Sequence, residues 1–236
     1  MISATAMLAV QGGLMGTGWA DVFSPNIRQA VLQTQFGGVW LWQIVLALVT
    51  LIVALMQPRN MPRLLFMLTT AQFILLAGIG HATLNEGVTA KIHQTNHAIH
   101  LICAAAWFGG LYPGALVYAT HQRPLATPGR SALMRFSWCG HFAVIGVLAS
   151  GVLNALLITG FPPTLTTYWG QLLLLKAILV MIMVVIALAN RYVLVPRMRQ
   201  DEDRAAPWFE WMTKLEWAIG AVVLVIISLL ATLEPF

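Results

Sequence analysis

Three histidines lie close together in an otherwise apolar part of the sequence: His93, His97 and His100. At 3.6 residues per turn they fall at about 0°, 40° and −20° around a helix, so the three imidazoles share one stripe. Cys103 follows one turn further along, on the shoulder of the same face. Imidazoles at this spacing, with soft sulfur nearby, suit copper or zinc. The pattern therefore predicts a metal site, with an alternative in which interfacial histidines only anchor or cap the helix.

Three further side chains extend this candidate site. His81 ends the preceding apolar stretch at the surface where the stripe begins, so it offers another imidazole. Cys139 and His141 lie near the far end of the next stretch and offer a thiol and an imidazole at greater depth. A buried cysteine is more often a small apolar filler than a ligand, so this second pair also has a structural interpretation.

A catalytic interpretation has little support in the sequence. The H-x-x-x-H spacing also occurs in zinc proteases, but Gln94 stands where their general base, a glutamate, would be. Neither an ATP-binding motif nor a soluble catalytic domain is present. We therefore expect a binding or transport protein and not an enzyme.

The candidate ligands must be positioned by long apolar helices. Of the 236 residues, 59% are hydrophobic and only 9% are charged, and the mean hydropathy is +0.79. A soluble domain carries about 25% charged residues, whereas a transmembrane helix needs roughly 20 mostly apolar ones. We therefore predict an all-α, polytopic transmembrane helix bundle that forms a single domain over residues 1–236 in the lipid bilayer. The predicted spans, about seven, are Ile2–Thr17, Gly38–Met56, Leu64–Gly80, Gln94–Ala119, Phe136–Thr159, Tyr168–Leu194 and Leu215–Leu233.

Basic residues in the loops predict how this bundle is oriented. The net charge is +5 and the sequence pI about 9.7, which in a soluble chain would suggest nucleic acid as a partner. Here ten of the thirteen Lys and Arg side chains lie in one alternating set of loops and two in the other, so no nucleic acid is expected. By the positive-inside rule, the basic loops face the cytoplasm. The opposite loops and the C-terminus then face the periplasm.

Small and charged residues inside the spans predict special packing. Gly109, Gly110, Gly146 and Gly151 would let neighbouring helices approach closely. Lys176 lies within the sixth stretch, where it either extends to the outer interface or provides a fixed positive charge in the bundle.

The chain resembles a known family at these motifs. The run His93–His100, followed by Trp107-Phe108-Gly109-Gly110-Leu111, is similar to the signature of the CopD-type copper resistance proteins. Arg135-Phe136-Ser137 before a histidine-bearing span, and Leu174-Leu175-Lys176 in the next span, resemble the same family. The similarity covers essentially the whole chain. The positions carried over by it are His93, His97, His100, Trp107 and Lys176.

The resemblance implies a protein of the bacterial inner membrane with eight helices. The chain would then begin inside the second of them, with the first missing. It also implies a role in copper uptake or homeostasis, with copper taken from the periplasmic side and a small periplasmic copper-binding protein of the CopC type as partner.

Two alternatives remain open at this point. In a b-type cytochrome, two histidines on facing helices would bind haem. His100 lies about 10 Å and His141 roughly 27 Å below the outer surface, so these two could not share one haem, whereas His81 and His97 could. The other alternative is a protein that docks the periplasmic copper carrier without binding metal itself.

Overall fold

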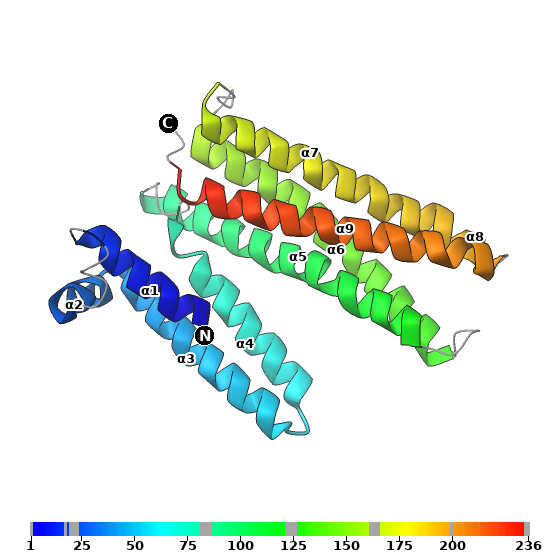
Figure 1. Ribbon diagram of the computed structural model, residues 1–236, viewed down its shortest axis with the longest axis horizontal. Coiled ribbons are helices and arrows are strands. Elements are labelled where there is room, and N and C mark those ends of the chain that lie inside the picture. Colours follow the sequence, from blue (N-terminus) through cyan, green and yellow to red (C-terminus); the bar gives the residue numbers. More distant parts are fainter. Residues whose placement is uncertain are drawn as a thin grey trace. The chain divides into compact units, whose positions relative to one another are not determined.

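The computed structural model describes residues 2–16, 18, 24–80, 86–120, 127–160, 166–198 and 201–233. All regular secondary structure in these ranges is helical (Figure 1), which confirms the all-α prediction. The elements are α1 (Ile2–Met15), α2 (Pro25–Gln33), α3 (Gln35–Met56), α4 (Met61–Leu76), α5 (Gly87–Thr120), α6 (Thr127–Thr159), α7 (Tyr168–Ala189), the π-helical turn η3 (Asn190–Leu194), α8 (Val195–Met198) and α9 (Glu202–Leu230).

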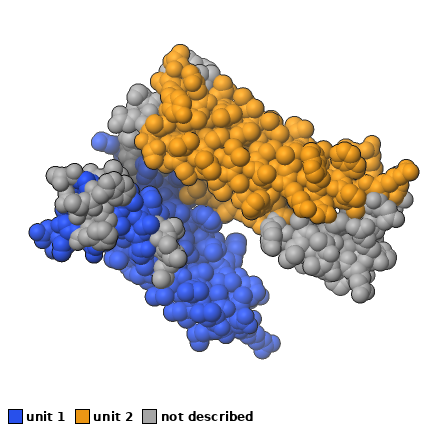
Figure 2. Space-filling model, in the orientation of Figure 1, with its two compact units in different colours: residues 1–98 blue, residues 99–236 orange. Residues whose placement is uncertain are grey.

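The chain forms two compact units, residues 1–98 and residues 99–236, which are coloured separately in Figure 2. The division falls inside α5, between Ala98 and Ile99. Compactness does not tell whether either unit folds by itself, so the single-domain organisation stays a prediction.

Four helical segments are long and apolar enough to cross a bilayer: Gln35–Met56, Cys139–Thr159, Tyr168–Arg197 and Arg204–Leu230. Met61–Leu76 is apolar but shorter. Large apolar side chains on these helices are exposed, as Leu55 at 74% and Ile145 at 62% illustrate. Such surfaces suit lipid, which requires only that backbone polar groups be paired within each helix. The transmembrane helix bundle is confirmed, and the number of seven spans stays a prediction.

Several helices extend beyond the predicted apolar stretches. The expected loop before the histidine stripe is helical from Gly87, and α9 begins at Glu202 instead of Leu215. α2 was not predicted at all; Pro25 lies in its first turn and Val31 is its buried residue. An apolar stretch in the sequence indicates only the part of a helix that contacts hydrocarbon. The helix itself begins at a capping residue, which can lie several residues earlier. At α9, the Asp201 side chain accepts from the Arg204 amide at 3.3 Å.

Polar contacts hold the helices of the first unit together. The Gln43 side chain donates to the Gln72 carbonyl, and the Gln72 side chain donates to Thr50 Oγ1 at 3.1 Å, which joins α3 to α4. The turn from α2 to α3 is closed by Thr34, whose hydroxyl accepts from the Gly37 amide at 3.0 Å. A side chain at Gly37 would collide with the Val31 backbone, so this turn requires glycine.

The core of the second unit is built by α5, α6, α7 and α9. Its buried side chains pack into one cluster, made up of Trp107, Ala143, Val147, Met183, Val184 and Val223. Gly146 and Gly151 lie where α6 meets side chains of α5, which confirms the predicted close approach. The same prediction is wrong for Gly109, because a Cβ there would meet open space.

A buried carboxyl group lies beside this core. Glu216 of α9 is 1% exposed, and its Oε1 accepts a hydrogen bond from Nε1 of Trp107 at 3.1 Å. A buried polar group without a partner costs about 1–3 kcal/mol. The bond therefore fixes the register of α5 against α9.

Replacing Trp107 by phenylalanine removes the indole donor to Glu216 and should lower the free energy of unfolding by about 1–3 kcal/mol. Adding Glu216→Leu should recover part of that loss, because the unpaired carboxyl is then gone. Glu216→Gln keeps an accepting oxygen and serves as the control. Thermal unfolding is measured for wild type, for Trp107→Phe and Glu216→Leu alone and combined, and for the control. Strictly additive losses in the double variant would show that the bond contributes nothing.

Candidate metal site

The predicted histidine stripe lies on one uninterrupted helix, α5. His93 is almost completely buried, at 1% exposed, while His97 and His100 are half-buried. His93 and His97 belong to the first compact unit, and His100 belongs to the second. Since α5 begins at Gly87, His93 lies well inside the helix, although the predicted apolar span begins only at Gln94. His81 lies outside the described residues.

His100 is oriented by a hydroxyl of the neighbouring helix. Its Nδ1 is 3.0 Å from Oγ of Ser150 in α6. The Ser150 hydroxyl donates its single proton to the Gly146 carbonyl, so towards His100 it can only accept. Nδ1 then carries the proton, and the lone pair of the neutral ring is on Nε2. Metal-binding histidines commonly donate their second N–H to an oxygen in this manner, so His100 has the tautomer that a ligand needs.

Cys103 lies on the same contact between α5 and α6, one turn from His100. A Cβ built on Gly146 would be only 2.5 Å from the Cys103 Sγ, and one on Gly151 would be 3.2 Å from Cε1 of His100. We call this contact, formed by His100, Cys103, Gly146, Ser150 and Gly151, the α5–α6 seam. The absence of side chains at the two glycines is what allows both candidate ligands to sit between the helices.

The second predicted pair is not brought together. Cys139 is exposed and free of disulfide bonding, whereas His141 is half-buried. Two residues along a helix correspond to about 200° of rotation, so the two side chains leave opposite sides of α6. His141 instead meets Tyr192, with Nε2 3.1 Å from the phenol oxygen and the rings arranged edge to face.

The described residues contain no group of three or more His, Cys, Asp or Glu side chains close enough to hold a metal ion. The individual ligands nevertheless have suitable chemistry, since His100 is correctly protonated and Cys103 is soft. Among the described residues, the candidate ligands therefore do not form one closed coordination shell.

Sequence reasoning missed three polar residues around the candidate ligands. Ser150 orients His100, Tyr192 contacts His141, and Glu216 accepts from Trp107. Glu216 could have been noticed, because a carboxylate in the first turn of a predicted span is unusual. Ser150 lies between the two glycines already singled out, but only the pairing of α5 with α6 reveals its partner. Lys176 is half-buried in α7.

Comparison with protein families divides the chain into two matching regions. Residues 1–92 match the N-terminal domain of copper resistance protein D-like proteins, and residues 130–230 match copper resistance protein D. No solved structure matches the chain.

Three curated proteins are similar to the chain over most of its length. The inner membrane protein YebZ of Escherichia coli is 89% identical over the whole chain, which spans 81% of that protein. Copper resistance protein D of Pseudomonas syringae is 29% identical over the whole chain, spanning 80% of that protein. The copper transport protein CutJ of Bacillus subtilis is 29% identical over 94% of the chain and 42% of its own length. The chain therefore belongs to the copper resistance protein D family.

Proposed function

We propose that this protein takes copper from the periplasmic side of the inner membrane and passes it inward along α5. The observation that carries the proposal is the placement of His100 and Cys103 on the α5–α6 seam, in line with the buried His93 further up the same helix. Membership of a copper resistance family makes copper the metal that these ligands would handle. Two relatives of the chain are named as a copper resistance protein and a copper transport protein.

The entry site in this proposal consists of His93 and His97, one turn apart on α5, with His81 as a further ligand. Imidazole binds copper well in either oxidation state, and helical neighbours at i and i+4 project to the same side. The basic loops and the positive-inside rule predict that this end of the helix faces the periplasm. A CopC-type periplasmic copper carrier would deliver the ion there.

The inward path follows the α5–α6 seam. His100 lies at the level of Ser150 and Gly151, Cys103 at the level of Gly146, and His141 about 15 Å further along α6 than Gly151 at 1.5 Å per residue. Cys139 is an additional soft ligand near the inner end. An ion that must be released binds each position weakly, so one or two ligands at each level suit transfer better than a closed site.

Alanine at both His93 and His97 should lower copper bound by the purified protein and copper accumulated by cells by roughly tenfold or more, because the entry ligands are gone. The control is Thr95→Ala, on another face of the same helix, where the hydroxyl only bonds the Lys91 carbonyl at 2.8 Å. Unchanged copper binding and accumulation would refute the entry site. A Soret band in the absorption spectrum would point instead to haem.

Gly146→Ala tests the seam, because the added methyl group would displace the Cys103 sulfur. We expect a loss of about 1–3 kcal/mol in stability from overpacking, together with reduced copper accumulation. Gly140→Ala is the matched control, since a Cβ at Gly140 meets nothing within 4 Å. Adding Cys103→Ala to Gly146→Ala should restore most of the stability but not the accumulation. If cells with the Cys103→Ala protein accumulate as much copper as cells with the wild-type protein, Cys103 is not part of the proposed copper path.

A further inference from the structure

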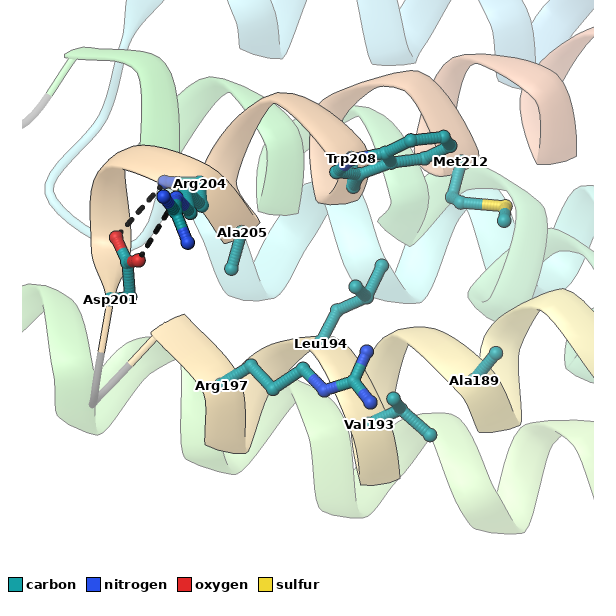
Figure 3. A pocket seen from close by; sticks show the side chains of 9 residues that line it. All are labelled: Ala189, Val193, Leu194, Arg197, Asp201, Arg204, Ala205, Trp208 and Met212. Atoms are coloured by element: carbon teal, nitrogen blue, oxygen red, sulfur yellow. Dashed lines mark hydrogen bonds and ion pairs between the residues drawn. The ribbon is translucent and has the colours of Figure 1, made fainter.

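A pocket opens in the second unit, at the end of α7 and the start of α9. It has a volume of about 590 Å³ and lies between η3 and α8 on one side and the first turns of α9 on the other. Figure 3 shows Arg197 and Arg204 at this pocket together with Asp201, and Trp208 and Met212 further along α9. Nothing in the proposed copper path uses this place.

The charge of the pocket suits a single phosphodiester. Its lining carries two arginines and one aspartate, which leaves one net positive charge. Arg204 shares its charge with Asp201, whose Oδ2 is 3.6 Å from Nε. Arg197 is exposed, and it forms no ion pair with any side chain that the structure describes. Guanidinium groups bind phosphate oxygens with two parallel hydrogen bonds, so each arginine of the lining is a suitable partner for a phosphate.

The remaining walls of the pocket are apolar. Leu194, Val193, Trp208 and Met212 line it, and the volume is far larger than a free phosphate ion needs. Aromatic surface is exposed here as well, since Trp208 in the lining is 60% exposed and Tyr192, next to Val193 in the chain, is 61% exposed. A lipid places its phosphate among the arginines and its chains along this surface, whereas an inorganic anion would leave the apolar walls wet.

The position along the helices agrees with a lipid headgroup. The segment Arg204–Leu230 of α9 is long and apolar enough to span a membrane; Arg204 lies at its start, and Trp208 follows one turn later. Arginine at the hydrocarbon boundary followed by tryptophan is the usual order at a membrane interface. This end also carries the loops that the positive-inside rule assigns to the cytoplasm, where anionic lipids meet basic pockets between helices.

We propose that this pocket binds the headgroup of an anionic phospholipid, with Arg197 and Arg204 holding the phosphate and Trp208 covering the glycerol region. Asp201 competes with the phosphate for Arg204. The pocket is separate from the histidines of α5, so this proposal does not depend on the copper path.

The test uses the whole purified protein in detergent, titrated with phosphatidylglycerol, phosphatidylcholine or sodium phosphate. Bound lipid is measured by native mass spectrometry, and stability by thermal unfolding. Wild-type protein should retain phosphatidylglycerol over phosphatidylcholine and gain thermal stability from it. In the Arg197→Gln/Arg204→Gln protein, affinity for phosphatidylglycerol should fall about 25-fold, at about fivefold for each basic residue near a lipid surface.

Two further variants sharpen the result. Arg59→Gln/Arg63→Gln removes two exposed arginines of the same predicted side from outside the pocket, and should retain the lipid as wild type does. Asp201→Asn keeps a helix-capping side chain but removes the competing charge, so it should bind phosphatidylglycerol more tightly.

If both double-arginine variants lose lipid equally, lipid binding depends on the overall surface charge and not on this pocket, and the proposed site is wrong. Equal stabilisation by sodium phosphate would overturn the lipid assignment in favour of a free anion. Unchanged lipid retention in the Arg197→Gln/Arg204→Gln protein would likewise refute the proposal.

Discussion

The helices of the second unit depend on pairing buried polar side chains with one another, because hydrocarbon offers no hydrogen bonds. Trp107 with Glu216 joins α5 to α9, and His100 with Ser150 joins α5 to α6. The same bonds fix the rotation of α5 about its axis. The bond to Ser150 also sets the tautomer of His100, which is the tautomer that metal-binding histidines commonly have. Stability and candidate function therefore use the same contacts.

Close packing along the α5–α6 seam also limits what the site can be. The helices approach at Gly146 and Gly151, where the Cys103 sulfur and the His100 imidazole lie in the space that larger side chains would need. An ion at any level would be bound by few side chains from few directions. That geometry favours exchange between neighbouring positions over storage, and it agrees with the lack of a closed cluster in the described ranges.

Much of the fold could be predicted from periodicity and composition. The histidine stripe could be predicted once this segment was taken to be helical. Close packing at Gly146 and Gly151 could be predicted once a neighbouring helix was assumed. What could not be predicted depends on partners far away in the sequence. Cys139 and His141 look like a pair in the sequence but leave opposite sides of α6, where His141 meets Tyr192 of η3. Polarity, moreover, marked the start of α9 as a loop although its charged residues are good helix formers.

The π-helical turn η3 lies between the part of α7 that packs in the core and the part of the chain that lines the pocket. In one continuous α-helix, the orientation of the first part would determine that of the second. A π turn contains one residue more than an α turn, so everything after Leu194 is rotated by about 100° relative to an uninterrupted α7. The side that α7 turns towards the core can therefore differ from the side that α8 turns towards the pocket. Sequence change at the membrane boundary is thereby uncoupled from packing in the interior. Relatives could alter the residues around Arg197 without repacking Met183 and Val184.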